Sequence, residues 1–207
     1  MADAACAMFP LGSVLFPHAV LPLHVFEPRY RLMTEQCIAR DGTFGVVLIE
    51  RGSEVGGGDV RFDVGTLAQI VQAGRFDDGR YAVVAVGVRR LRVRSWLPDD
   101  PYPRAEVDLL DEPDDTIDPG QLEVVTHLLA RVRALLAELG ASIPSEPIEL
   151  SVDDPVRASF EAAALAPLGP LDAQALLEVA EPGARLTRLA ELLTEEARVL
   201  EFRLSGE

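Results

Sequence analysis

The stretch "DEPDDTIDPG", from Asp111 to Gly120, limits the possible fold more than any other feature of the sequence. It is acidic, carries two prolines and is poor in large apolar side chains, so a folded core gains little by burying it. Most apolar residues before it recur at strand-like spacing, whereas those after it recur at helical spacing. We therefore expect a β-rich domain over residues 1–112 and a helical domain over residues 113–207.

The first part is typical of a strand-rich domain with one helix. Asp78-Gly79 separates two apolar runs, which predicts a hairpin. "RGSEVGGGD", Arg51 to Asp59, is glycine-rich and lies between two expected strands, so a loop is favoured over a phosphate-binding turn, which would lead into a helix. The expected strands are Ala7–Leu11, Leu21–Phe26, Thr43–Ile49, Gly65–Ala73, Tyr81–Trp96 and Arg104–Leu110.

The sequence "LPLHVFEPRYRLM" changes period halfway, from a strand to a helix. Glu27 lies in the capping position and Pro28 in the first helical position, and the helix is expected to run to Arg40 and to stop at Asp41-Gly42. Phe26 and Tyr30 would clamp this hinge to the sheet, and Arg29 would help to orient the helix. A structural role therefore explains the hinge better than a chemical one.

The second part is typical of a small helical bundle. Asp118, Pro119 and Gln121 form a capping-box arrangement ahead of an apolar stripe that ends at Gly140. A second helix is expected to start at Asp154-Pro155 and to end at Pro167. A third is expected to open at Asp172, and a fourth to run from Pro182 to Leu204. The stripe of the first helix consists of Leu122, Val125, Leu129, Val132, Leu136 and Leu139, and that of the last of Leu186, Leu189, Leu193, Leu200 and Leu204.

Charge and composition exclude several classes of function. All 19 basic residues are arginine. A phosphate-binding P-loop, Schiff-base chemistry and a Ser-Lys dyad each need a lysine, so we expect this chain to be neither an ATPase nor a Ser-Lys protease. The formal charge is −15, of which −2 belongs to residues 1–110 and −13 to residues 111–207, and this balance argues against nucleic acid as a partner.

The compartment follows from absent signals. No apolar run approaches the roughly 20 residues that cross a bilayer, and the first residues lack the pattern of a secretory signal. Cys6 and Cys37 form no repeated spacing, which favours a reduced, cytoplasmic protein. Cys37 lies on the apolar side of the expected first helix, so we expect it to pack in a core.

The remaining candidate sites each have a structural explanation. His18, His24 and His127 form no metal-ligand spacing, and His127 follows Glu123 by four residues, which predicts a surface ion pair. No metal or cofactor site is therefore expected. In "VGVRRLRVRSW", three arginines alternate with Leu91 and Val93, so a strand would present them on one face. The three arginines are Arg90, Arg92 and Arg94. We favour a solvated face on which they pair with acids such as Asp63, Glu106 or Asp108 over a surface that binds anions or acidic peptides.

Several segments, taken in order, resemble the Lon substrate-binding domain. They are "FPLGSVLFPHAVLPLHVFEPRYRLM", "VGTLAQIV", "VVAVGVRRLRVRSW", "YPRAEVDLLDE" and "LDAQALLEVAEPGARLTRLAELLTEEARVL". That domain is the N-terminal part of the ATP-dependent Lon protease and also occurs in cereblon-type proteins and as stand-alone bacterial proteins. The resemblance implies an α+β fold: a PUA-like β pseudo-barrel with one inserted helix, followed by a C-terminal helical bundle.

The resemblance also implies a function. Because the sequence stops at Glu207 and has no lysine, neither the ATPase nor the protease of full Lon is expected, and a non-catalytic module remains. It would bind unfolded or tagged protein segments, as an adaptor or competitor for an ATP-dependent protease. The alternative is a small-molecule or nucleic-acid-binding sensor that uses a cleft of the barrel. The candidate peptide-binding residues are Phe26, Glu27, Arg29, Tyr30, Arg90 and Arg92.

Overall fold

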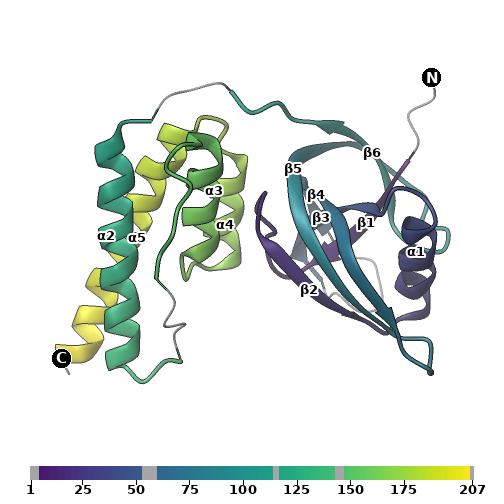
Figure 1. The fold of residues 1–207 in the computed structure, drawn as a ribbon, viewed down its shortest axis with the longest axis horizontal. Coiled ribbons are helices and arrows are strands. Elements are labelled where there is room, and N and C mark those ends of the chain that lie inside the picture. The colour runs from purple at the N-terminus through teal and green to yellow at the C-terminus, as the bar shows by residue number, and fades with distance from the viewer. Residues whose placement is uncertain (1–4, 53–59, 114–116, 143–146, 206–207) are drawn as a thin grey trace. The chain divides into compact units, whose positions relative to one another are not determined.

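The computed structural model describes residues 5–52, 60–113, 117–142 and 147–205. The chain divides into two compact units, Met1–Asp111 and Glu112–Glu207. Figure 1 shows that the first unit consists of strands and one helix, and that the second consists of helices. The α+β fold class expected from the sequence is therefore confirmed.

Six strands form one sheet in the first unit. Its order is β2-β5-β4-β3-β1-β6, and β6 pairs in addition with β5. Five of the strands thus close into a barrel-like ring, while β2 pairs only with β5 among the described strands. The β1–β3 pair is parallel and the other pairs are antiparallel. The strands are β1 (Cys6–Leu11), β2 (Val20–Val25), β3 (Thr43–Arg51), β4 (Val60–Arg75), β5 (Tyr81–Leu97) and β6 (Arg104–Leu109).

Two apolar clusters lie on opposite faces of β3. Val47 belongs to the smaller cluster, to which β1, β5 and β6 also contribute and against which Leu67 of β4 packs. Because all five ring strands supply side chains, this cluster fills the ring. The neighbouring Val46 belongs to the larger cluster, which includes Tyr30, Met33 and Cys37 of the helix α1 (Pro28–Ile38). Successive strand residues point to opposite faces, so β3 is buried on both sides, and Cys37 packs in the core as predicted.

The ends of α1 follow local rules of backbone geometry. Glu27 has an extended backbone in the N-cap position, and Pro28 begins the helix with no intrahelical donor lost. At the other end, the N–H of Gly42 donates to the carbonyl of Cys37 at 2.8 Å. Gly42 has a φ of 72°, a backbone conformation that favours glycine. The hairpin predicted at Asp78-Gly79 is also present, and Gly79 has a φ of 81°.

The second unit contains four helices in its described residues. Asp118 caps α2 through a capping box with Gln121, as predicted. In the core of the unit, α2 packs against α5, and α3 packs against α2, α4 and α5. The bounds are α2 (Pro119–Glu138), α3 (Pro155–Leu165), α4 (Pro170–Glu178) and α5 (Pro182–Ser205).

Three details of the helical unit correct the expectations. The third of these helices begins at Pro170 with Gly169 as its cap, so Asp172 lies in the first turn instead of opening the helix. His127 makes no ion pair with the carboxylate of Glu123; its Nδ1 lies 3.1 Å from the backbone carbonyl of that residue. Leu204 is exposed, because the C-terminal end of α5 extends past the buried stripe. Most of the predicted Arg51–Asp59 loop lies outside the described residues.

Candidate functional site

A cavity of about 200 Å³, here called the hinge cavity, opens where β2 leads into α1. Its walls come from Phe9 and Leu11 of β1, residues 22–25 of β2, and the turn that ends at Tyr30. Among the described strands β1 and β2 do not pair with each other, so the backbone leaves a space between them. The cavity therefore brings together Phe26, Glu27 and Tyr30, three of the residues that the sequence singled out.

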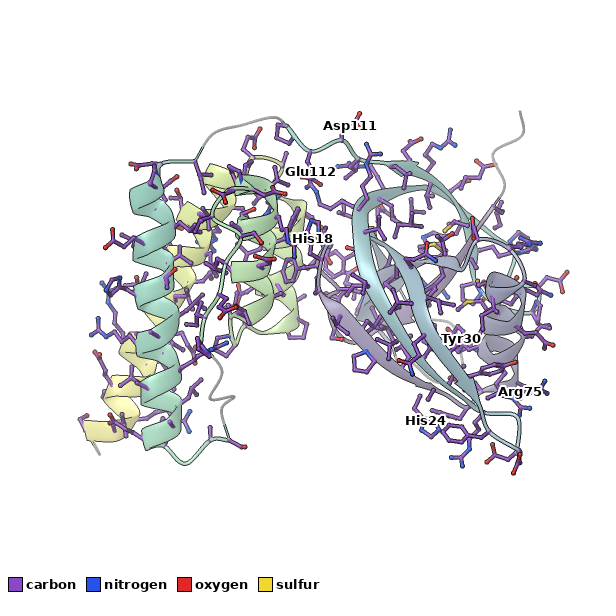
Figure 2. The ribbon with its side chains drawn as sticks, in the orientation of Figure 1. His18, His24, Tyr30, Arg75, Asp111 and Glu112 are labelled. Atoms are coloured by element: carbon purple, nitrogen blue, oxygen red, sulfur yellow. The ribbon has the colours of Figure 1, made fainter. Side chains whose placement is uncertain are left out.

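Tyr30 forms the inner wall of the hinge cavity. Its ring stacks on Phe9 with 4.2 Å between centroids and 9° between planes, and Phe9 in turn contacts Phe44 at 6.2 Å. Figure 2 shows Tyr30 between α1 and the strands. Stacked aromatic pairs add to the free energy gained by burial, so Tyr30 fixes the helix to the sheet, as predicted.

The charged residues of the hinge are paired with each other. The Nε of Arg29 donates to the Glu27 carboxylate at 3.1 Å, and the guanidinium lies 4.5 Å from the centroid of the Tyr30 ring. Glu27 occupies the N-cap position, but its side chain makes no capping hydrogen bond. The expected side-chain cap is therefore wrong, because the carboxylate is turned toward Arg29.

Phe26 lies at the rim of the cavity with 54% of its surface exposed. It does not clamp the hinge to the sheet, which corrects the expectation. Its neighbour Val25 takes the buried position, since alternate residues of a strand point to opposite faces. A large aromatic side chain is thus left in solvent beside an apolar cavity.

The arginines of β5 do not join this site, and only part of their predicted stripe is exposed. Leu91 and Val93 point into the ring as expected, and Arg94 pairs with Asp108 at 3.3 Å. Arg92 is exposed, but Arg90 is only 2% exposed, so the prediction of three solvated guanidinium groups is wrong.

The burial of Arg90 has a tertiary cause. Arg90 pairs across the sheet with Thr66, whose hydroxyl donates to the carbonyl of Leu15 at 2.5 Å. A Cβ added at Gly87 of the same strand would clash with the carbonyl of Phe16. The segment after β1 therefore runs over this face and covers it. The spacing within β5 alone carries no signal of that cover.

The described ranges contain no group of three His, Cys, Asp or Glu side chains that could hold a metal ion. His24 instead makes an edge contact with the ring of Phe76, with 6.0 Å between centroids. Figure 2 shows His24 at the end of the sheet where Arg75 also lies. The hinge is thus an apolar and aromatic site, suited to binding more than to chemistry.

Comparison with known proteins assigns the fold to a family. A model of the ATP-dependent protease La (LON) substrate-binding domain matches residues 5–195. The chain belongs to this family. Lon protease of Escherichia coli K12 is 30% identical over 199 residues, which are 94% of this chain and 25% of that protein. Lon protease 1 of Myxococcus xanthus is 30% identical over 203 residues, with coverage of 94% and 25%.

Solved structures of Lon N-terminal domains have the same fold. A Lon N-terminal domain protein from Xanthomonas campestris superposes with a TM-score of 0.67 at 28% identity, over 90% of this chain and 96% of that chain. The N-terminal domain of Mycobacterium avium complex Lon protease gives a TM-score of 0.59 at 17% identity, over 92% and 98%. The chain spans about a quarter of the length of the curated Lon relatives. No described helix is both long and apolar enough to cross a bilayer.

Two walls of the hinge cavity in this Lon-family chain could not be recognised from the sequence. Phe9 and Leu23 are ordinary apolar strand residues whose spacing matches many core positions. They meet because β1 and β2 face each other across a gap, which is a consequence of long-range pairing. The signal that the sequence did contain was the change of period at Glu27-Pro28, which marked the hinge.

Proposed function

We propose that this chain is a non-catalytic module that binds exposed, apolar segments of other proteins and acts as an adaptor or competitor for an ATP-dependent protease. The family's description as a substrate-binding domain supports this proposal. The observation that carries it is the hinge cavity with the exposed Phe26 at its rim. Tagged segments are a further class of client.

The size of the cavity favours a peptide side chain. Pockets for drug-sized molecules usually have about 300–1,000 Å³, whereas the hinge cavity has about 200 Å³. One large apolar side chain of a bound segment would enter it and contact Phe9, Leu23 and Tyr30. Phe26 would then lie against the same segment and lose its exposure to water, which is favourable for an aromatic side chain.

The neighbouring strand favours side-chain capture over addition of a complete strand. β2 pairs with β5 only among the described strands, so its outer edge is available to an extended peptide. Pro22 lies in the middle of β2 and has no N–H, which interrupts any continuous ladder. Backbone contacts would therefore be few, and the binding free energy would come mainly from the cavity and Phe26.

Charge favours a segment with basic flanks. Residues 111–207 carry a net charge of −13, and exposed acids attract a basic chain over the Debye length of about 8–10 Å at 0.1–0.15 M salt. The apolar contacts at the hinge should depend little on salt, because Glu27 and Arg29 are already paired there, whereas the attraction of basic flanks to exposed acids should weaken as salt rises. Arg90 is buried, so Arg92 is the remaining exposed arginine of the candidate set.

The proposal is tested with two fluorescent peptides of the same apolar core, one with arginine flanks and one with glutamate flanks. The basic peptide should bind more tightly and weaken as salt rises. Phe26→Ala should weaken both about tenfold, as expected for an aromatic anchor. Phe202→Ala is the matched control, since Phe202 on α5 is 59% exposed.

Three outcomes of this titration would contradict the peptide-binding role. They are equal binding of both peptides without salt dependence, equal effects of Phe26→Ala and Phe202→Ala, and no binding. The adaptor or competitor role has a separate test, in which the chain is added to a Lon protease that is degrading an unfolded substrate. Degradation should become faster or slower with wild-type chain and less so with Phe26→Ala; an unchanged rate would refute that role.

A further inference from the structure

A second and larger cavity lies elsewhere in the first unit and shares no lining residue with the hinge cavity. Its volume is about 630 Å³, within the range of small-molecule sites. Its walls come from the end of α1, the start of β1, and the approach to β6, through Cys37, Arg40, Cys6, Tyr102 and Arg104. We name it the arginine cavity.

Two guanidinium groups on its walls have few partners. Arg40 follows α1, and its side chain makes no hydrogen bond or ion pair with any described residue. Arg104 donates one long hydrogen bond of 3.4 Å to the carbonyl of Pro98, while its Nε is buried without a partner. A buried donor without an acceptor costs free energy, which an incoming acceptor would recover.

Both arginines line the same cavity as Tyr102. Burial raises the pKa of the Tyr102 hydroxyl, while the positive charges of Arg40 and Arg104 act in the opposite direction. The hydroxyl donates to Oε1 of Gln36 at 2.5 Å, so the amide N–H groups of Gln36 remain as donors. The two arginines and the amide of Gln36 thus place hydrogen-bond donors on the wall of the cavity.

Two acids and two thiols also line the cavity, and the acids balance the formal charge of the two arginines. Asp41 accepts hydrogen bonds from the backbone N–H and the hydroxyl of Thr43, at 3.1 and 2.8 Å, which lower its pKa and fix it in a turn. Asp100 is exposed and also lines the cavity. Burial raises the pKa of Cys6 and Cys37 to about 11, so both thiols are neutral near pH 7.

We propose that the arginine cavity binds a small molecule through one oxyanion group, a carboxylate or a phosphate, held by Arg40 and Arg104. Guanidinium groups match the geometry of both anions and bind them with paired hydrogen bonds. Asp100 also lines the cavity, and its carboxylate repels a bound anion, which favours a ligand of low charge. This small-molecule site is independent of the peptide-binding role proposed above.

The test is a calorimetric titration of the full chain with inorganic phosphate and with benzoate, which separate the two sources of the oxyanion. Benzamide is the uncharged control. At least one anion should bind saturably, and Arg40→Gln should weaken it about tenfold or more, as expected for a charged hydrogen bond. Arg203→Gln, at an exposed arginine outside the cavity, should leave anion binding unchanged.

Asp100→Asn should change the anion affinity in the opposite direction from Arg40→Gln. A variant that binds more tightly cannot be explained by loss of stability. Loss of the repelling charge should tighten the anion about threefold. A second readout is the rate at which iodoacetamide alkylates Cys6 and Cys37 at mildly alkaline pH. The bound anion should slow this alkylation in the wild-type chain but not in Arg40→Gln. The proposal is overturned if neither anion binds, if benzamide binds equally well, or if Arg40→Gln and Arg203→Gln behave alike.

Discussion

Arg185 of α5 is fully buried, an unusual position for an arginine. Its guanidinium lies 3.6 Å from the centroid of the Phe160 ring and donates to the hydroxyl of Ser159 and to the carbonyl of Val179. It also pairs with Glu112 at 3.6 Å. A buried cation costs free energy unless it is paired and hydrogen-bonded, so these contacts stabilise it together. The side chain thus joins α3, α5 and the first residue of the helical unit.

Replacement of this residue should destabilise the helical unit strongly. Arg185→Ala should lower the free energy of unfolding by about 3–5 kcal/mol, because Glu112 and the carbonyls lose their donor inside the protein. Arg188→Ala is the matched control on the same helix; its exposed pair with Glu191 should contribute about 1 kcal/mol or less. Urea denaturation followed by helical circular dichroism measures both. Equal stability of the two variants would show that Arg185 has no such role.

At the scale of elements, each described helix begins at a proline. For α2, three features together decide where the helix starts. Asp118 accepts from the N–H of Gly120 at 2.9 Å, Gln121 reaches back to the N–H of Asp118 at 3.4 Å, and Pro119 takes the first turn. Gln121 in addition donates to Thr187 of α5 at 3.1 Å. The cap is therefore both a local start signal for α2 and a contact between the two longest described helices.

Removal of the α2 cap should have a small and local effect. Asp118→Ala should cost about 1 kcal/mol, within the range of about 0.5–2 kcal/mol for N-cap residues, and should speed amide hydrogen exchange in the first turn of α2. Asp118→Asn keeps a side-chain acceptor and should leave both measurements close to wild type. If Asn is as damaging as Ala, the charge of Asp118 and not its capping hydrogen bond matters.

At the scale of the whole molecule, contacts concentrate within two units that meet at Asp111 and Glu112. Glu112, the first residue of the helical unit, pairs with Arg185 of α5. Each unit has its own apolar interior: the two clusters of the β unit, and the buried leucines of α2, α4 and α5.

Limited proteolysis should therefore separate the two units. A protease that cuts after acidic residues should cleave the folded chain first near Asp114–Asp118 and release a β-rich and a helical fragment. The denatured chain, as control, should be cut throughout. First cleavage within Leu122–Leu139 would contradict the two-part organisation.

The sequence by itself determined the type and order of the elements and several of their ends, because those depend on residues within a few positions of one another. Pro28 after Glu27, the Asp118 capping box and Asp78-Gly79 each fix the local backbone, and the repeat of apolar residues decides between strand and helix. The sequence also revealed the hinge, because the change of period at Glu27-Pro28 is local. It did not reveal that the hinge forms the wall of a cavity.

Only the tertiary structure decided which side chains remain available to a ligand. Arg90 has the spacing of an exposed residue but is covered by a segment more than 70 positions earlier in the chain. Phe9 and Phe26 line one cavity, and Arg40 and Arg104 line another, through long-range strand pairing that no short stretch encodes. Exposure is set by what packs on a residue from far along the chain, and local spacing carries no record of that packing.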